Sequence, residues 1–556
     1  MASQAVEVEK KYDVGPDAEV PSLADIPGVA RVGEPHVDTL EAVYFDTAGH
    51  TLASRDITLR RRTGGVDAGW HLKLTAEGPR SGGETVGLGS PGGGTGTGTG
   101  TGTEPQRRRE LHAPLGQPGV VPDSLLAYVL AYLRGEDAAP VVRLETRRTT
   151  YPLYGEDGVH LADLADDRVS AELLGAAGGA ADVTADATAG GAPEAADGRE
   201  PRTRQWREWE LELVHGSPDL FPAAAEILAA AGASPAKHGS KLAKVLALPA
   251  REPGAGDGPK SPGKKGPVSD LLTAYLAAQI SEILALDPGV RLEEPEAVHD
   301  LRSATRRARS ALAAYRRLYS PVAGRRLRDE LKWLGSVLGS PRDAEVMLTR
   351  LLGHAAELHP GLASAVKGRL DDELGTTLNT AYRKLQKALL SERYFRLLDD
   401  LEAFRDHPPV RPEGAVPARK AAGKLVGKAA KRLQRAARAA KRARRGAEHE
   451  TALHDVRKDA KRLRHVAESA APVHGKRATK IAKAAHRQQQ VLGDFHDSVV
   501  ARDLLAKLAV APDLPEAVAS AYVTLHTRQV QLAADAEAEY RQERKKSRKR
   551  LQRGVI

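Results

Sequence analysis

Charged residues alternate at the start of the chain in a pattern that could hold a divalent cation against a phosphorylated ligand. In residues 6–12, VEVEKKY, the period-two alternation of a β-strand places Glu7, Glu9 and Lys11 on one face. Two carboxylates one pleat apart beside an ammonium group suit this chemistry. A solvated edge strand has the same spacing, so the other strands must decide between the two interpretations.

Further short runs bring charged residues into phase in the same way. Arginine forks and lysine ammonium groups bind phosphate oxygens, and glutamate clusters bind Mg²⁺ or Mn²⁺. One such strand alone is ordinarily a solvated face, but the joint phase of several strands favours a shared binding interior. The in-phase sets are Arg60 with Arg62, His71 with Lys73, Arg143 with Arg147, and Glu208 with Glu210 and Glu212.

Eight strands are predicted to position these residues. Apolar or alternating runs lie at about 6–12, 40–48, 56–63, 68–76, 107–113, 141–153, 158–167 and 206–214, and helical patterns lie at about 123–134, 218–231 and 237–247. We therefore predict an α+β domain over residues 1–248, with a closed or nearly closed eight-stranded antiparallel β-barrel and flanking helices. Two low-complexity inserts, 78–103 and 175–198, are expected to be flexible loops without chemistry.

A barrel interior with this much charge needs compensation, because an unpaired interior charge costs several kcal/mol. A phosphorylated ligand with its metal would supply that compensation. The ordered set of motifs resembles the CYTH, or triphosphate tunnel metalloenzyme, family over residues 1–248. The motifs are Glu-x-Glu-x-Lys at 7–11, Leu-Arg-x-Arg at 59–62, Trp-x-Leu-Lys at 70–73, Glu-x-Glu-x-Glu at 208–212 and Ser240-Lys241.

The resemblance implies an eight-stranded tunnel in which basic residues hold a triphosphate and glutamates hold one or two divalent cations, Mg²⁺ or Mn²⁺. It implies catalytic roles for Glu7 and Glu9, and for Lys11 as the residue that orients the attacking water. The implied metal ligands are Glu7, Glu9, Glu210 and Glu212. The implied substrate-binding residues are Arg60, Arg62, Lys73, Arg143, Arg147 and Lys241.

Two strands leave alternatives open. Either Arg147 or Arg148 faces the tunnel from the sixth strand, and either Asp163 or Asp166 supplies the aspartate expected on the seventh. Glu110 is a further acid candidate, but the insert that precedes it leaves its register open.

Composition divides the chain into two halves. Residues 1–248 carry 24 Lys and Arg against 36 Asp and Glu, and residues 249–556 carry 59 against 37, so the net charges are −12 and +22. A strongly basic half is expected to meet a polyanion. There is no Cys, which excludes disulfides and thiolate metal sites. No apolar run approaches the roughly 20 residues of a membrane span, and we expect a cytoplasmic protein without a membrane partner.

The second half is predicted to be all α-helical and internally duplicated. A Pro- and Gly-rich linker at 249–267 precedes a helical domain at 268–540, and a basic tail follows at 541–556. HDLRSATRRAR at 299–309 recurs as HDVRKDAKRLR at 454–464, and VLGSPRD at 337–343 recurs as VLGDFHD at 491–497. The two offsets, 155 and 154 residues, predict two similar halves that face one another.

Each copy of the repeat forms a basic stripe within an arc of about 80° on a helical wheel. Two stripes related by pseudo-symmetry would line a positively charged groove or pore. The repeat resembles the CHAD family, which is associated with inorganic polyphosphate, over about residues 268–540. The implied polyphosphate-binding residues are His299, Arg302, Arg306, Arg309, His454, Arg457, Lys461 and Arg464.

The two resemblances together predict hydrolysis of inorganic triphosphate (tripolyphosphate) in the tunnel and polyphosphate binding by the helical domain, with an association with polyphosphate granules. One alternative is a non-catalytic polyphosphate-binding protein. Another is a tunnel enzyme for thiamine triphosphate or nucleoside triphosphates, including adenylate cyclase. Residues 418–446 carry 12 Lys and Arg and no acid, which keeps nucleic acid as a weaker alternative partner. Aromatic residues make up only 4% of the chain, so there is little for bases to stack on.

Overall fold

The computed structural model describes residues 3–75, 105–174, 203–249, 263–512 and 514–552. The chain forms two compact units, Met1–Gly256 and Asp257–Ile556. Both predicted inserts lie outside the described residues, as does most of the predicted linker at 249–267.

The first unit is a closed antiparallel β-barrel, as predicted. Its strands follow one another around the ring in the order β1, β6, β5, β4, β3, β7, β8, β9, and β9 pairs with β1 to close it. Two short strands, β2 (Arg31–Val32) and β10 (Ser234–Pro235), extend β7 and β1. The eight barrel strands are β1 (Ser3–Val14), β3 (His36–Asp46), β4 (Thr58–Thr63), β5 (Gly69–Thr75), β6 (Gln106–Ala113), β7 (Ala139–Tyr154), β8 (His160–Leu173) and β9 (Thr203–Leu213).

Apolar residues lie on the outer face of much of this barrel, beneath helices. Trp70 and Leu72 of β5 pack with Leu125 and Val129 of α1 (Asp123–Leu133). A second cluster joins Trp209 and Leu211 of β9 to Phe221 and Leu228 of α2 (Leu220–Ala230). Both tryptophans are fully buried, so each anchors its strand to a helix. Because side chains alternate along a strand, fixing these outward residues turns their charged neighbours inward.

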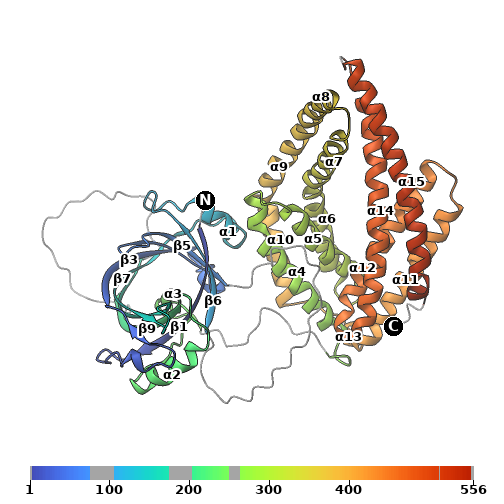
Figure 1. Ribbon diagram of the computed structural model, residues 1–556. Helices are drawn as coiled ribbons and strands as arrows, with labels where there is room; N and C mark the ends of the chain where they lie inside the picture. The colour runs from blue at the N-terminus through green and yellow to red at the C-terminus, as the bar shows by residue number, and fades with distance from the viewer. Residues whose placement is uncertain (1–2, 76–104, 175–202, 250–262, 513, 553–556) are drawn as a thin grey trace, which may run out of the picture. The chain divides into compact units, whose positions relative to one another are not determined.

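The short helix α3 (Lys241–Val245) fills one end of the barrel and lies within the outline of the ring in Figure 1. Its Leu242 and Val245 pack with Ala42, Leu144 and other apolar residues of β3, β7 and β8. The Ser240 hydroxyl caps the helix by accepting a hydrogen bond from Ala243 N at 3.1 Å. This packing sets Lys241, the first helical residue, at the tunnel.

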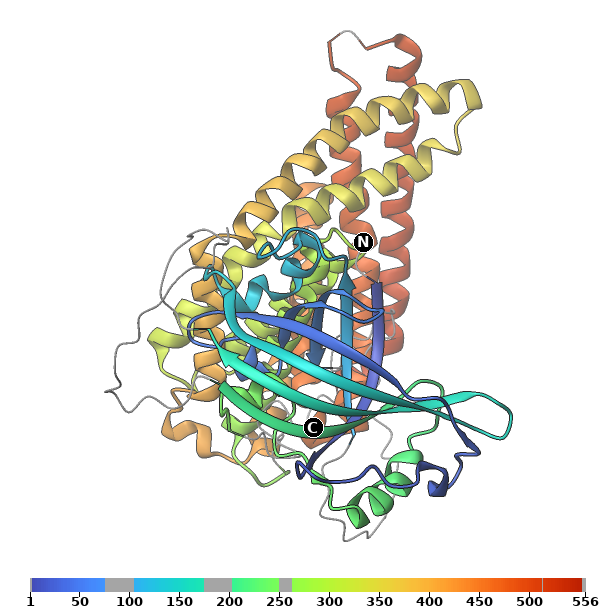
Figure 2. The same cartoon turned by 90° about the vertical axis from the view of Figure 1, so that its left-hand side faces the viewer.

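The second unit is all α-helical, as predicted. The longest pair, α14 and α15, runs side by side in Figures 1 and 2. The helices are α4 (Val268–Arg291), α5 (Ala297–Ala314), α6 (Pro321–Val337), α7 (Gly339–Ala355), α8 (Pro360–Leu370), α9 (Thr376–Leu389), α10 (Glu392–Asp406), α11 (Ala418–Arg442), α12 (Ala447–Ser469), α13 (Ala471–His474), α14 (Lys476–Leu508) and α15 (Glu516–Gln552). None of the helices in the described parts of the chain combines the length and apolarity that a membrane crossing needs.

The predicted basic tail, residues 541–556, is helical in its described part, because α15 continues to Gln552. Apolar contacts explain the continuation, because Tyr540 and Leu551 are both buried and the Leu551 carbonyl accepts a hydrogen bond from Gln434 of α11 at 3.0 Å.

Candidate functional site

The first and last strands of the barrel bring their charged faces together. In the β1–β9 pairing, Lys11 lies opposite Glu210 and Glu9 lies opposite Glu212. All four residues line one cavity of about 610 Å³ inside the barrel. The two sequence segments with the most distinctive charge pattern, 200 residues apart, therefore form one surface.

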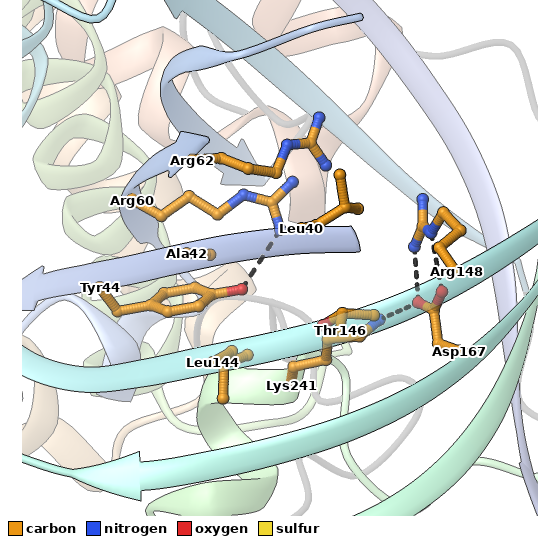
Figure 3. Close-up of a pocket in the computed structure, with 10 residues that line it drawn as sticks. All are labelled: Leu40, Ala42, Tyr44, Arg60, Arg62, Leu144, Thr146, Arg148, Asp167 and Lys241. Atoms are coloured by element: carbon orange, nitrogen blue, oxygen red, sulfur yellow. Dashed lines mark hydrogen bonds and ion pairs between the residues drawn. The ribbon is translucent and has the colours of Figure 1, made fainter. Parts of the chain in front are cut away.

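The cavity is lined almost entirely by ionisable groups. It continues into a smaller cavity of about 280 Å³, which shares Arg60, Arg62, Arg148 and Lys241 with it (Figure 3). Among the described residues, the two cavities together are lined by seven basic and seven acidic side chains. The basic set is Lys11, Arg60, Arg62, Lys73, Arg108, Arg148 and Lys241, and the acidic set is Glu7, Glu9, Asp67, Glu110, Asp167, Glu210 and Glu212.

The balance between acidic and basic side chains limits which ligands the interior can bind. Because the lining has no net charge, a polyanion alone would add uncompensated negative charge to a buried space. A polyanion that enters with divalent cations would not. The interior is therefore suited to a phosphorylated chain together with metal ions.

Lys11 is held as an ammonium between two carboxylates. Its Nζ lies 2.7 Å from Glu9 Oε2 and also contacts Glu210 Oε1. Burial alone would lower the pKa of Lys11, but the carboxylates of Glu210 and Glu9 outweigh it and raise the pKa above its ordinary value. A permanently charged ammonium can orient a water molecule or a phosphate oxygen, but it cannot take up a proton.

The acid end of the cavity carries excess negative charge. Burial, with the nearby charges of Glu7, Glu9 and Glu210, raises the pKa of Glu212 to about 7, although Lys73 opposes the shift. Glu9 Oε1 is buried and, within the described parts of the chain, has no hydrogen-bond partner. An unpartnered carboxylate oxygen beside a carboxyl group with a raised pKa fits a divalent cation, which prefers oxygen ligands. Glu7 lies at the same end, where Lys73 Nζ contacts it at 2.6 Å.

A second acidic cluster is already neutralised by basic side chains. Asp167, Glu208 and Glu210 have oxygen atoms within 4.8 Å of one another, and all three side chains are buried. Lys241 Nζ lies 2.8 Å from Asp167 Oδ2 and 2.7 Å from Glu208 Oε1 and Glu210 Oε1. Arg148 adds contacts of 2.6 Å to Asp167 Oδ2 and Glu210 Oε2.

Basic side chains dominate the opposite wall. Arg60 Nη1 donates to the Tyr44 hydroxyl at 3.3 Å (Figure 3). Burial and the charges of Arg60 and Arg148 lower the pKa of Arg62 to about 9. These guanidinium groups repel one another, and an anion bound between them would relieve that repulsion.

His71 lies behind this wall and contacts two oxygens. Its Nδ1 is 3.0 Å from Glu110 Oε1 and its Nε2 is 2.9 Å from the Asp67 carbonyl. Burial lowers the pKa of His71 to about 4. The imidazole orients Glu110, which faces the larger cavity.

The two basic stripes of the helical unit come from the two copies of the internal repeat and lie on neighbouring helices. The stripe of α5 and the stripe of α12 lie on helices in contact. Burial, with the charges of Arg302 and Arg457, lowers the pKa of Arg306 to about 10, so cations from both helices share one region.

In each stripe, an arginine guanidinium lies close to a glycine. A Cβ built on Gly339 would lie 3.3 Å from the Arg302 guanidinium, and one on Gly493 would lie 3.5 Å from that of Arg457. These glycines belong to the repeated VLG motif. The absence of a side chain at each glycine therefore allows the facing arginine to lie close to the backbone, and the repeat preserves this contact.

Comparison with known proteins identifies both units. The CYTH domain model matches residues 5–245, and the CHAD domain model matches residues 274–506. Two uncharacterized proteins of Mycobacterium tuberculosis, MT2285 of strain CDC 1551 / Oshkosh and Rv2226 of strain ATCC 25618 / H37Rv, are each 37% identical over 539 residues, covering 95% of this chain and 93% of theirs. The chain belongs to the CYTH–CHAD family.

Two solved structures are also similar to part of this CYTH–CHAD protein. PptA from Streptomyces chartreusis is 24% identical, with a TM-score of 0.42, over 50% of this chain and 99% of that one. The CHAD domain from the plant Ricinus communis is 26% identical, with a TM-score of 0.41, over 51% of this chain and 93% of that one.

Most of the residues predicted for the CYTH tunnel line it. Glu7, Glu9, Lys11, Arg60, Arg62, Lys73, Glu210, Glu212 and Lys241 all face the cavities, and so does Glu110. Glu210 differs from the other predicted metal ligands, because Lys11, Lys241 and Arg148 already contact its two oxygens.

Arg143 and Arg147 do not face the tunnel, which corrects the prediction. Arg143 is 47% exposed and lies near Glu41 and Glu172 on the outer surface, and Arg147 is exposed as well. Leu144, Thr146 and Arg148 of β7 face inward. The strand alternates as expected, but the opposite set of residues points into the barrel.

The aspartate of β8 is neither of the two that the sequence left open. Asp166 faces outward and binds Arg207 at 2.7 Å, and Asp163 contacts His160 at 2.8 Å without lining either cavity. Asp167 is the buried tunnel residue. The pairing of Asp167 with Arg148 across β7 and β8 would have revealed it, had the register been known.

The predicted site also lacked Asp67, which lines the larger cavity, and three further residues. Arg108 has the phase of Glu110, Glu208 has the phase of Glu210, and Tyr44 lies opposite Arg60 in the β3–β4 pairing. Alternation had already placed Glu208 on the same face as Glu210, and it could have placed Arg108 on the same face as Glu110.

The eight CHAD stripe residues lie on α5 and α12, as expected. His299 and Arg309 are exposed, and the other six are half-buried. Arg302 donates to Asp343 at 2.8 Å, and Arg464 donates to Glu468 at 2.7 Å, so part of each stripe already has an acidic partner.

Proposed function

We propose that the CYTH unit hydrolyses inorganic triphosphate with Mg²⁺ or Mn²⁺ and that the CHAD unit binds inorganic polyphosphate. CYTH domains are typically triphosphate tunnel enzymes. The observation that carries the proposal for this chain is the closed, charge-balanced interior, with its basic wall and its metal-compatible acid end.

Different tunnel residues would bind the substrate, hold the metal and orient the attacking water. Arg60, Arg62, Lys73 and Arg148 bind phosphate oxygens and hold the chain in line along the barrel. Glu7, Glu9 and Glu212 would hold the metal, which supplies charge neutralisation of the terminal phosphoryl group. Lys11 orients the attacking water as a charged donor. Acceleration then comes mainly from orientation and electrostatics.

A phosphate-release screen tests the enzymatic part. Tripolyphosphate, ATP and thiamine triphosphate are each incubated with Mg²⁺ or Mn²⁺, and a Glu9→Gln variant serves as the control for the site. We expect metal-dependent release from tripolyphosphate that is lost in Glu9→Gln. Equal release by both proteins, or release only from ATP or thiamine triphosphate, contradicts the proposal. No release at all leaves the non-catalytic polyphosphate-binding alternative.

The CHAD part is supported by the shared region of cations from α5 and α12. Long polyphosphate binds through many phosphate contacts, so its retention should fall steeply with salt. Binding to polyphosphate would bring the enzyme to polyphosphate granules in the cytoplasm.

A matched pair of variants tests this part. One carries glutamine at four stripe positions, Arg302, Arg306, Arg457 and Lys461. The other carries glutamine at four exposed cations of α11, Lys424, Lys428, Lys431 and Arg438. Both lose four positive charges, so a difference between them reports position rather than net charge.

We expect the stripe variant to lose retention on polyphosphate and the α11 variant to keep most of it, with tripolyphosphate hydrolysis unchanged in both. Equal losses would show that net charge alone decides binding. Displacement of polyphosphate by duplex DNA at equal phosphate concentration would favour the nucleic-acid alternative.

A further inference from the structure

Lys241 occupies the centre of a three-carboxylate cluster. Its Nζ lies within 2.8 Å of one oxygen each from Asp167, Glu208 and Glu210. Figure 3 shows the ammonium aimed at Asp167 beside Arg148. One ammonium group therefore contacts all three carboxylates of the cluster.

The same oxygens have the arrangement of a divalent-cation site. They lie within 4.8 Å of one another, so oxygen ligands at about 2.0–2.6 Å from a shared ion could reach it. In the described ranges no other group of three His, Cys, Asp or Glu side chains meets this criterion, so Glu7, Glu9 and Glu212 at the acid end are spaced more widely. The ammonium therefore lies where such an ion would bind.

Charge and geometry indicate that Lys241 keeps a metal out. Arg148 and Lys11 also contact the cluster, so three carboxylates face three cations. A divalent ion would add two charges within contact distance of an ammonium that shares its ligands. The acid end differs, because Glu9 Oε1 is unpartnered among the described residues.

The position of Lys241 is fixed by the fold. It is the first residue of α3, which is capped by Ser240 and anchored in the barrel by Leu242 and Val245. Its side chain is 8% exposed. A buried ammonium on an anchored helix resembles a bound ion more than a mobile surface lysine.

We propose that Lys241 is a resident cation that closes a second divalent-cation site, formed by Asp167, Glu208 and Glu210. The metal of the proposed function then binds only at the acid end, with Glu7, Glu9 and Glu212. Removal of the Lys241 charge opens the second site to Mg²⁺ or Mn²⁺. The proposal rests on the proposed function only for the presence of a metal at the acid end.

Mn²⁺ binding to the full-length chain tests the proposal. Bound Mn²⁺ is counted by equilibrium dialysis, or by the electron paramagnetic resonance signal of the free ion, without substrate. We expect Lys241→Met to bind one Mn²⁺ more than the wild type and to gain thermal stability when Mn²⁺ is added. Lys244→Met serves as the control, because this residue lies on the same helix and its Nζ is 3.8 Å from Glu208.

Two further variants make the result specific. In the Lys241→Met background, Asp167→Asn should remove the extra Mn²⁺. In the wild-type background, Asp167→Asn should leave the number unchanged, because the site is closed there.

An unchanged count in folded Lys241→Met overturns the proposal. So does the loss of one Mn²⁺ from Asp167→Asn with Lys241 intact, which would make the cluster an ordinary metal site. This second arm can overturn the proposal even if Lys241→Met does not fold. Failure of the proposed function is detected separately, as missing phosphate release by a wild-type protein whose Mn²⁺ count is unaffected.

Discussion

Replacement of Arg148 by methionine should weaken substrate binding strongly, whereas the same change at Arg147 should have no effect. The two residues are neighbours on β7, but only Arg148 lines the cavities, and Arg147 is exposed on the outer face. Methionine keeps much of the side-chain length and removes the charge. A comparison of the two variants therefore tests whether the positive charge must point into the tunnel.

The magnitude follows from the contacts of Arg148. Its guanidinium donates to Asp167 at 2.8 and 2.6 Å and to Glu210 at 2.6 Å, and it presents its charge to the cavity. A hydrogen bond to a charged partner contributes about 1.5–3 kcal/mol. We expect Arg148 to make a hydrogen bond of similar strength to a phosphate oxygen of the substrate. The loss of that hydrogen bond should raise KM for tripolyphosphate by about 10- to 150-fold.

Arg148→Met should remain folded. Asp167 keeps Lys241 as a partner, and Glu210 keeps Lys11 and Lys241, so no carboxylate is left without a cation. We expect a loss of about 1–3 kcal/mol in the free energy of unfolding for Arg148→Met and less than about 0.5 kcal/mol for Arg147→Met.

Steady-state phosphate release across a range of tripolyphosphate concentrations, with urea unfolding of each variant, measures both effects. A KM for Arg148→Met within twofold of the wild type would refute the assignment of Arg148 to the tunnel. A larger rise for Arg147→Met than for Arg148→Met would refute the register of β7.

Three further outcomes are expected. Glu9→Gln should lower kcat by about 10² or more at saturating Mg²⁺ or Mn²⁺, because a main electrostatic contact is lost, and wild-type turnover would remove Glu9 from the site. Lys11→Ala should chiefly lower kcat and Lys73→Ala should chiefly raise KM in the same kinetics, and the reverse division would contradict their roles. Burial lowers the pKa of His465 in the CHAD unit from 6.5 to about 3, so its contribution to stability is present above pH 6.5 and is lost as pH falls. At pH 5 this loss is about 2 kcal/mol. The free energy of unfolding, measured with urea, should therefore fall between pH 7 and pH 5 by about 2 kcal/mol less in His465→Gln than in the wild type. An equal fall in the two proteins would contradict this prediction.

Alternation along strands made most of the tunnel predictable from sequence. Glu7, Glu9 and Lys11 share a face under any strand register, and so do Arg60 and Arg62. The in-phase charges could therefore be assigned to one interior before the pairing of strands was known. The eight strands and the helical repeat followed from equally regular patterns.

Alternation could not say which of two faces points inward when both carry charge. On β7, Arg143 and Arg147 formed a longer in-phase set than Arg148, yet the apolar Leu144 and Val142 go with Arg148 and pack against α3 and its neighbours. The packing of these apolar residues sets the orientation of the strand. Asp167 was missed for a related reason, because its partners Arg148 and Lys241 come from other elements.

The closure of the barrel by β1 and β9 has a consequence for how the protein is made. Glu7, Glu9 and Lys11 leave the ribosome about 200 residues before Glu210, Glu212 and Lys241. A nascent chain that stops before residue 241 lacks the ammonium that neutralises Asp167, Glu208 and Glu210. The charged face of the first strand is therefore buried only after the last strand is made, and a CYTH unit truncated before residue 241 would leave Glu208 without its cationic partners.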